Sequence, residues 1–185
     1  MDVESSEREA LAHYLFVRTE EAFARLFESL YPRFYRYFRG HGFAHGTAEE
    51  LSQNVLVAVH RSVESLRDAG AFIPWAYRIA RNEALQERRR LHSASRSAEL
   101  VDFDERTVAA RRDEGGGAGF LAEWKDSLDG IEKEILVLRF VEGMEYHEIA
   151  EALGMPLGTV KWRIFQTKRK IAAAMGAVAG ARRRW

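Results

Sequence analysis

The sequence predicts an all-α fold in which two small helical domains are joined by a flexible acidic linker, with a helix-turn-helix in the C-terminal domain. Apolar residues recur every three or four positions through most of the 185-residue chain, which is the period of an amphipathic helix. No β-branched run alternates with polar residues as a half-buried strand would. A glycine-rich stretch at 115–119 separates the two periodic regions, and glycine is costly to order in a helix or strand.

The first periodic region, residues 19–92, predicts three helices. Pro32 interrupts the first, so we expect a kink or two shorter helices there. Thr47 and Glu50 have the spacing of a capping box and predict the start of the second helix. A turn at 68–70 precedes the third. The residues expected to point inward are Phe23, Leu26, Phe27, Leu30, Phe34 and Phe38, then Leu51, Val55, Val59, Val63 and Leu66, then Phe72, Trp75, Ile79 and Ala80.

The second periodic region, residues 128–185, begins with another capping-box spacing. Asp129 and Glu132 are placed to cap each other's backbone N–H groups, which predicts a helix start. The apolar stripe that follows on this helix is Ile131, Ile135 and Leu138.

A helix-turn-helix pattern occupies residues 145–170. Such a motif needs a small residue in its first helix, a glycine at the turn and an apolar residue in its second helix. Ala150, Gly154 and Val160 stand in that order. Pro156 lies near the start of the second helix, where its missing N–H costs little. The remaining inward positions are Ile149, Leu153, Leu157 and Ile164.

The formal net charge of zero is a sum of unlike segments. Residues 1–18, an N-terminal leader, carry −2; residues 19–92 carry +2; the linker at 93–127 carries −3; and residues 128–185 carry +3. The last acidic residue is Glu151. Eight basic residues follow it unopposed: Lys161, Arg163, Lys168, Arg169, Lys170, Arg182, Arg183 and Arg184.

Several classes of function are disfavoured by what the sequence lacks. It has no cysteine, hence no disulfide framework and no thiolate zinc site. Its six histidines form no HExxH pattern, and His41 and His45 lie among glycines in an expected solvated loop. With neither a phosphate loop after a strand nor a nucleophile elbow, we expect no catalytic residue, no metal, no cofactor and no enzyme.

The expected location is the cytoplasm. The longest apolar runs fall short of the roughly 18 residues that a membrane helix needs, so no membrane insertion is expected. Residues 1–4 are acidic and lack the basic and apolar segments of a secretory signal.

Two sets of residues are candidates for contact with nucleic acid. Basic, amide and aromatic side chains on the second helix of the helix-turn-helix suit phosphates and base edges in a major groove; the alternative is a solvated basic face. On the third helix of the first region, arginines lie beside aromatics, an arrangement that suits the binding of single-stranded nucleic acid. The alternative is that these aromatics belong to the core and that the arginines are solvated. The first set is Thr159, Lys161, Trp162, Arg163, Phe165, Gln166, Lys168 and Arg169, and the second is Arg78, Arg81, Asn82, Arg88 and Arg89 near Trp75 and Tyr77.

Residues 47–55 and 72–82 resemble the second domain of bacterial extracytoplasmic-function sigma factors of the sigma-70 family. Residues 136–143, 146–154 and 158–161 look like the fourth domain of the same family. The resemblance implies a protein that is a monomer when free, binds core RNA polymerase and directs it to promoter DNA, with an anti-sigma factor as a further candidate partner. From the sequence that follows the second lobe, we expect no sizeable further domain and no regulation by a large C-terminal extension.

The resemblance also assigns roles to individual residues. It implies that one face of the second helix docks on the coiled coil of the largest polymerase subunit, through Glu49, Glu50, Gln53 and Asn54. It implies recognition and opening of the minus-ten element by Ser65, Arg67, Arg78, Arg81, Asn82 and Arg88. The helix at 157–169 would read the minus-thirty-five element, the second lobe would sit on the flap of the other large subunit, and the linker would run toward the RNA exit path.

The chain departs from the family pattern at several positions. Trp162 stands where a serine is frequent and Gln166 where an arginine is frequent, so we hypothesise a shifted minus-thirty-five preference, because Gln reads adenine where Arg reads guanine. Asn54 replaces a frequent acidic residue and His60 a frequent tryptophan. Glu145 replaces a serine N-cap and predicts a weaker helix start.

The main alternative is a free-standing regulator with an N-terminal sensor lobe and a C-terminal helix-turn-helix. The second lobe alone does not separate the two, since such regulators share its recognition-helix pattern. The first lobe favours the sigma factor, because a sensor has no reason to combine an acidic docking helix with an arginine–aromatic helix. An adaptor that binds protein without reading DNA is disfavoured by the unopposed basic residues.

Overall fold

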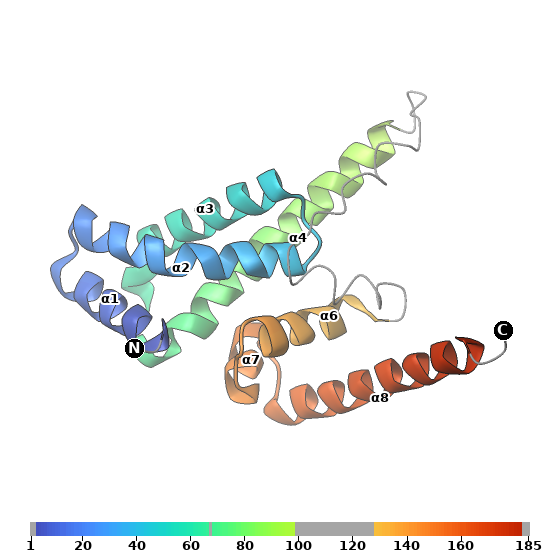
Figure 1. Cartoon of the computed structure of the whole chain (residues 1–185). Helices are drawn as coiled ribbons and strands as arrows, with labels where there is room; N and C mark the ends of the chain where they lie inside the picture. The colour runs from blue at the N-terminus through green and yellow to red at the C-terminus, as the bar shows by residue number, and fades with distance from the viewer. Residues whose placement is uncertain (1–2, 67, 99–127, 183–185) are drawn as a thin grey trace.

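The computed structural model describes residues 3–66, 68–98 and 128–182, and all regular structure in these ranges is helical, as predicted (Figure 1). The side chains described are those of residues 9–66, 68–93 and 128–173. The elements are α1 (Val3–Val17), α2 (Glu20–Gly40), α3 (His45–Ser62), η1 (Val63–Ser65), η2 (Ala69–Ala71), α4 (Phe72–Ala98), α6 (Gly130–Leu136), η4 (Val137–Val141), α7 (Tyr146–Leu153) and α8 (Leu157–Arg182). None of these described helices combines the length and apolar character that a bilayer span requires.

Helix α2 runs without a break through Pro32, so the alternative of two shorter helices is wrong. The hydroxyl of Thr19 caps its start by accepting from the Ala22 N–H at 3.2 Å. Leu30 and Phe34, on either side of the proline, are both buried. Their packing holds the helix together across the one backbone bond that proline removes.

Helix α3 begins at His45, two residues before the predicted capping box, and that prediction is wrong. Its N-cap is Ala44, which makes no side-chain cap. Thr47 lies within the first turn instead. The Tyr35 hydroxyl bonds to the His45 imidazole at 2.8 Å, so a contact from α2 supports the helix start in place of a local cap.

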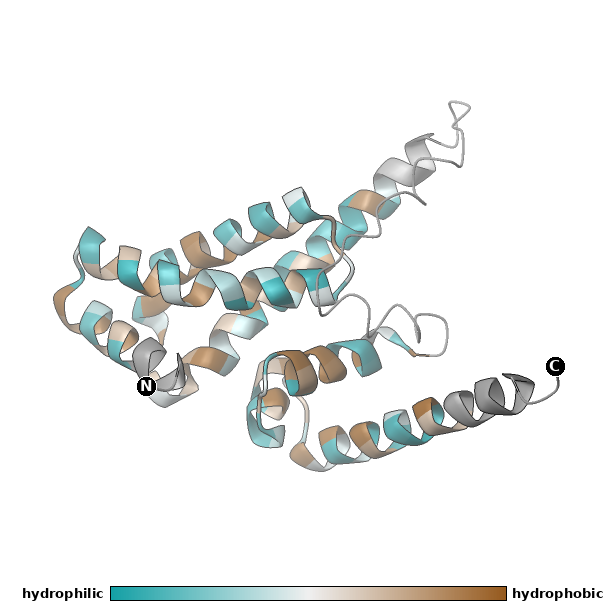
Figure 2. Ribbon diagram, in the orientation of Figure 1, coloured by the Kyte–Doolittle hydropathy of each residue, from teal (hydrophilic) through white to brown (hydrophobic). Residues whose placement is uncertain are grey.

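The first lobe, which comprises α1 to α4, closes around the inner face of α4. That face is Ala76, Tyr77, Ala80 and Ala84, all buried, and its small residues let neighbouring helices approach closely. Trp75 and Ile79, which were expected inside, are only half-buried. Helix α1 completes the lobe by packing on α2 with Leu11 and Tyr14 buried. Figure 2 shows the apolar residues (brown) along these helices.

The boundary between the first lobe and the linker differs from the prediction. Helix α4 continues to Ala98, so the first six residues of the predicted linker at 93–127 are helical. The rest of that linker, residues 99–127, lies outside the described residues.

The second lobe, which comprises α6 to α8, starts with the predicted capping box. Asp129 accepts from the Glu132 N–H at 2.7 Å and Glu132 from the Asp129 N–H at 2.9 Å. Helix α7 ends at Gly154, whose φ of +62° is left-handed and favours glycine. The predicted helix-turn-helix residues Ala150, Val160, Ile149, Leu153 and Ile164 are buried.

Two details of the helix-turn-helix differ from expectation. Leu157 is 39% exposed, because it is the first residue of α8. The N-terminus of α7 is supported by Glu148, whose carboxylate accepts from the Glu145 N–H at 2.7 Å.

The two lobes pack directly against each other. Helix α7 lies on α4 (Figure 1), and the segment η4 contacts α2. The buried apolar residues of both lobes form one continuous cluster.

Candidate nucleic-acid interface

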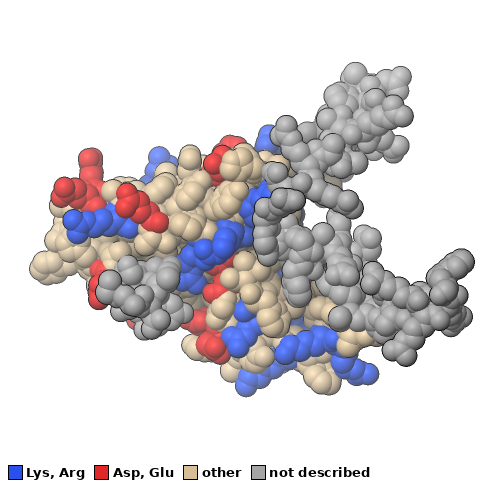
Figure 3. Space-filling model, in the orientation of Figure 1, with Lys and Arg blue, Asp and Glu red and all other residues tan. Residues whose placement is uncertain are grey.

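The outer side of α8 carries the residues predicted to meet duplex DNA. Val160, Ile164 and Thr167 are buried against the rest of the second lobe, so the opposite side faces outward. Figure 3 shows basic residues (blue) gathered along the edge of this lobe where α8 lies. Of the predicted residues, Lys161, Trp162, Phe165, Lys168 and Arg169 are exposed, while Thr159, Arg163 and Gln166 are half-buried.

Aromatic rings hold two of these cations in place. The Lys168 ammonium stands 5.9 Å from the ring centre of Phe140 in η4, and the Arg169 guanidinium 5.8 Å from that of Phe165. Trp162 and Phe165 each expose 57% of their surface. Large rings left in water beside cations are typical of a binding surface.

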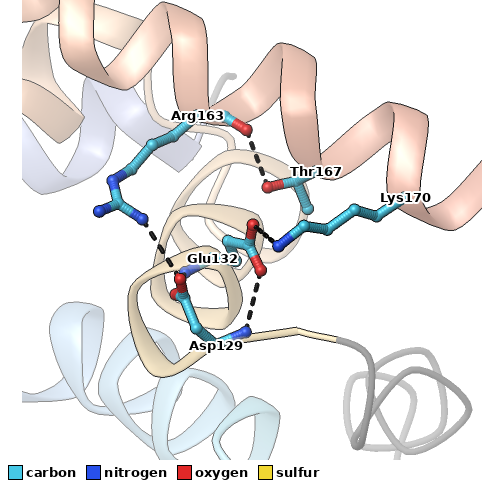
Figure 4. Close-up of polar contacts among 5 residues, drawn as sticks. All are labelled: Asp129, Glu132, Arg163, Thr167 and Lys170. Carbon is cyan, nitrogen blue, oxygen red and sulfur yellow. Dashed lines mark hydrogen bonds and ion pairs between the residues drawn. The ribbon is translucent and has the colours of Figure 1, made fainter.

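Arg163 is directed toward α6 rather than outward. Its Nη1 lies 3.3 Å from Oδ2 of Asp129, while Lys170 reaches Glu132 at 2.5 Å (Figure 4). Thr167 donates to the Arg163 carbonyl at 2.8 Å between these two ion pairs. The two capping-box acids thus bind two cations of α8 and set how this helix lies on α6.

The pKa of Asp129 reflects this arrangement. Burial opposes ionisation of its carboxyl, but the Glu132 N–H and the Arg163 guanidinium outweigh it and hold the pKa below its usual value. The carboxylate that caps α6 is therefore charged at neutral pH.

The residues of α4 predicted to contact nucleic acid divide between two sides of the helix, and all of them except Arg89 were assigned to the minus-ten element. Arg78, Asn82 and Arg89 are exposed, whereas Arg81 and Arg88 are half-buried. Ser65 in the preceding loop is also exposed, and Arg67 lies outside the described residues.

Arg88 is engaged within the first lobe. Its Nη2 lies 3.2 Å from Nδ1 of His41 and 3.4 Å from the carbonyl of the same residue, and its guanidinium lies over Phe43. This places Arg88 at the turn between α2 and α3. The solvated loop expected at His41 and His45 is wrong for His41, whose side chain is 1% exposed. The His45 side chain is 60% exposed, although it begins α3.

The predicted polymerase-binding residues share the outer side of α3. Leu51 and Val55 are buried on its inner side. On the outer side, Glu50, Gln53 and Asn54 are exposed and Glu49 is half-buried.

An aromatic ladder beside this face escaped the sequence analysis. The rings of Phe27, Tyr31 and Tyr35 on α2 stack in parallel, with centres 5.6 Å and 6.3 Å apart. Glu49 is close enough to Tyr31 to act on it electrostatically. Burial is the largest cause that raises the pKa of the Tyr31 hydroxyl, and the charge of Glu49 is the second. The spacing of four residues between aromatics would have revealed the ladder, but Phe27 was assigned to the core.

Two family profiles match the chain in the order of its lobes. Sigma-70 region 2 matches residues 26–94, and Sigma-70 region 4 matches residues 125–171. The chain belongs to the sigma-70 family, in its extracytoplasmic-function group.

Curated relatives of this sigma factor carry names from the same group. It is 29% identical over 134 residues to the ECF RNA polymerase sigma-E factor of Haemophilus influenzae, an alignment that covers 66% of this chain and 71% of that one. It is 28% identical over 140 residues to the RNA polymerase sigma-H factor of Pseudomonas aeruginosa, covering 69% and 72%.

Two solved structures share the fold of this sigma factor. CnrH in complex with the cytosolic domain of CnrY matches with a TM-score of 0.65 and 22% identity, over 93% of this chain and 98% of that one. RpoE in complex with the anti-sigma factor NepR, from Bartonella quintana, matches with a TM-score of 0.61 and 18% identity, over 80% and 92%.

This sigma factor is therefore not an enzyme but a protein that directs promoter-specific initiation. Region 2, in the first lobe, serves the minus-ten element, and region 4, in the second, serves the minus-thirty-five element. The presence of both regions disfavours the free-standing regulator with a sensor lobe.

Proposed function

We propose that this sigma factor docks on the coiled coil of the largest polymerase subunit through the outer side of α3 and the aromatic ladder of α2. The support is a surface on which Glu50, Gln53 and Asn54 are exposed beside Tyr31 and Tyr35. Acidic and amide groups flanked by rigid aromatic rings suit a protein partner, because aromatics supply contact area at low entropic cost.

The minus-ten element is captured by the loop at 65–71 and the exposed side of α4. Arg78 and Asn82 are one helical turn apart on that side, and Trp75 lies next to them with its ring half-buried. A cation, an amide and a ring within about two turns can hold a phosphate and stack an unpaired base. Arg67 belongs to the same loop, and Arg81 and Arg88 to the adjacent side of α4.

The minus-thirty-five element is read by α8 in the major groove. Lys161 and Arg169 are exposed and serve the phosphates, while Gln166 can bond an adenine edge with both atoms of its amide. The second lobe sits at the same time on the flap of the other large subunit. The observation that carries this function is the pairing of an exposed basic–aromatic α8 with an exposed amide–acid α3 in one chain.

Run-off transcription with purified core polymerase tests the proposal. The protein is expected to confer initiation at promoters carrying both elements, and to bind duplex DNA weakly on its own, since the polymerase supplies the remaining affinity. Tight, sequence-specific duplex binding without any gain in initiation would instead establish a free-standing regulator.

An anti-sigma factor is a further proposed partner, and the cytoplasm is the proposed location. The two solved structures compared above were determined with a protein partner, the cytosolic domain of CnrY in one and NepR in the other. A neighbouring gene whose cytosolic product blocks initiation by the purified protein would support it. The expected block is relieved by adding excess sigma factor.

A further inference from the structure

Trp162 is the largest apolar side chain on the outer side of α8, and 57% of its surface is exposed. The exposed rings of Phe165 and Phe140 are engaged by cations of the same helix. The guanidinium of Arg169 lies 5.8 Å from the ring centre of Phe165, and the ammonium of Lys168 lies 5.9 Å from that of Phe140. In the part of the chain that the structure describes, no such contact involves Trp162.

The place of Trp162 in the sequence turns its ring away from the second lobe. Val160 and Ile164 are buried on the inner side of α8. Trp162 stands two residues from each of them, which is a rotation of roughly 200° about the helix axis. The ring is therefore not part of the core of this lobe and is available to a partner outside it.

The surface beside this ring is open on the side toward the start of α8. Side chains of a helix lean toward its N-terminus, so the neighbour of Trp162 on that side is Gly158, one turn earlier. A Cβ at Gly158 would have nothing within 4 Å. An apolar group of a partner can therefore reach the indole from this side without displacing any described side chain.

The major groove of duplex DNA offers one kind of apolar group on its base edges. These edges present hydrogen-bond donors and acceptors, and thymine adds its C5-methyl. An indole has one N–H donor and no acceptor, so most of its surface cannot bond to the polar groups. Contact with a thymine methyl removes two apolar surfaces from water at once, and this is the favourable partner for the ring of Trp162.

Gln166 narrows down where this thymine lies. Helix α8 begins at Leu157, so Trp162 lies in its second turn, and the N-terminal part of such a helix contacts base edges. Trp162 and Gln166 are one turn apart, and the Cβ atoms of such neighbours are about 5–6 Å apart. Successive base pairs are separated by roughly 3.4 Å. The two side chains therefore reach the same base pair or pairs one or two steps apart.

We infer that Trp162 determines promoter specificity by reading the C5-methyl of one thymine in the minus-thirty-five element, within about two base pairs of the adenine that Gln166 bonds. This inference rests on the proposed function of α8. A serine, which is frequent in the family at this position, lacks the apolar surface for such a contact. The thymine is thus a preference of this chain that the common family pattern does not supply.

The test removes the methyl and nothing else. Holoenzyme is assembled from the full chain and core polymerase, and the promoter is the best one recovered by selection from a library. Each thymine of its minus-thirty-five element, on either strand, is replaced singly by deoxyuridine, which pairs like thymine but has no C5-methyl. At one thymine, the affinity of wild-type holoenzyme is expected to fall by about fourfold, the effect of one buried carbon group.

Two variants assign the effect to one ring. Trp162→Ala is expected to bind the thymine promoter about fourfold more weakly than wild type and to show no further loss with deoxyuridine at the decisive position. Phe165→Ala removes a ring of equal exposure that Arg169 already covers, and it should keep the deoxyuridine effect. An unchanged melting temperature and unchanged core binding in Trp162→Ala separate a DNA contact from a structural role.

A gain of binding provides the converse measurement. Cytosine is placed at the decisive position with guanine opposite, and its C5 is then methylated, which returns a methyl to the same place in the groove. Wild-type holoenzyme is expected to bind the methylated promoter about fourfold more tightly than the unmethylated one, and Trp162→Ala equally to both. Equal binding of both promoters by wild type would contradict the inference.

Equal affinity of wild type for the thymine promoter and for every deoxyuridine promoter would also overturn the inference, and the proposed function would stand. A deoxyuridine effect that persists unchanged in Trp162→Ala would assign the methyl to another residue. If the holoenzyme initiates at no promoter, the proposed function fails. The same deoxyuridine series is then measured by direct binding of the protein to a selected duplex at low salt, which still decides whether Trp162 reads a methyl.

Discussion

Arg163 of α8 and Asp129, the N-cap of α6, form an ion pair with 3.3 Å between Nη1 and Oδ2. The cation stands in the middle of the helix proposed to read DNA, yet its nearest acid lies within its own lobe. Arg163 therefore helps to orient α8, whereas Lys161, two residues earlier, is exposed. The roles of Lys161 and Arg163 can therefore be distinguished by substituting each residue in turn.

Lys161→Ala is expected to weaken minus-thirty-five-dependent initiation by about fivefold, roughly 1 kcal/mol, without changing thermal stability, because it removes only a phosphate contact. Arg163→Ala is expected to weaken initiation and also to lower the melting temperature by about 2–4 °C, because it removes the bond to Asp129. Run-off assays and thermal melts measure the two effects. Loss of core binding in either variant would show that the assigned roles are wrong.

Gln166→Arg is expected to change the preferred base in the minus-thirty-five element from adenine to guanine. An amide bonds adenine with two atoms and a guanidinium bonds guanine likewise, each worth about 1–3 kcal/mol of discrimination. Selection from a library of promoter variants measures the preference of both proteins. Recovery of the same sequence by wild type and variant would show that Gln166 does not contact a base.

Tyr31→Ala is expected to reduce affinity for core polymerase by about fivefold to tenfold, because it removes the middle ring of the ladder, and a central interface aromatic contributes about 1 kcal/mol or more. Tyr31→Phe keeps the stacking and is the matched control. Affinity is measured by fluorescence anisotropy with labelled sigma factor. Equal losses for both variants would point to the hydroxyl rather than the ring.

Glu142→Gln tests the effect of pH on the contact between the lobes. Burial raises the pKa of the Glu142 carboxyl, against the opposing effects of Tyr77, Arg36 and Arg33. Because folding raises the pKa of Glu142, the contribution of this residue to the free energy of unfolding is fully present below the ordinary glutamate pKa of about 4.3. That contribution is lost as pH rises through the pKa of Glu142 in the folded state. The stability of wild type relative to Glu142→Gln should therefore fall as pH rises above about 4.3.

Urea unfolding at a series of pH values measures this difference in the free energy of unfolding. Asp129→Asn is a useful comparison, since the pKa of Asp129 is lowered and its contribution is lost in the opposite direction, as pH falls through the folded-state value. A difference between wild type and Glu142→Gln that does not vary with pH would show that the pKa of Glu142 is the same in the folded and unfolded states.

Local patterns predicted the helices well. The stripe from Leu26 to Phe38, the capping box of Asp129 and Glu132, and the turn at Gly154 all depend on residues within a few positions of one another. The prediction failed at Thr47, where a side chain from α2 supports the helix start instead of a local cap. Local spacing shows that a cap is available, and packing decides whether it is used.

The candidate site was predicted from residue types. In the structure some of these residues are exposed, and others bond within their own lobe. Lys161 and Trp162 are exposed as expected, while Arg88 bonds to His41, which is far from it in sequence. A helical period cannot tell an arginine that faces water from one that faces a turn of its own lobe, because both lie outside the apolar stripe.

The sequence by itself determined that this chain is helical, that it has two lobes, and that those lobes carry the motifs of a sigma factor, since periodicity, caps and turn glycines are local properties. Only the tertiary structure decided where the charges go. Glu134 and Glu142 read as surface acids along the chain, but their partners Tyr37 and Tyr77 lie 97 and 65 residues away. Pairing over such distances follows no sequence period, because it depends on how the lobes pack.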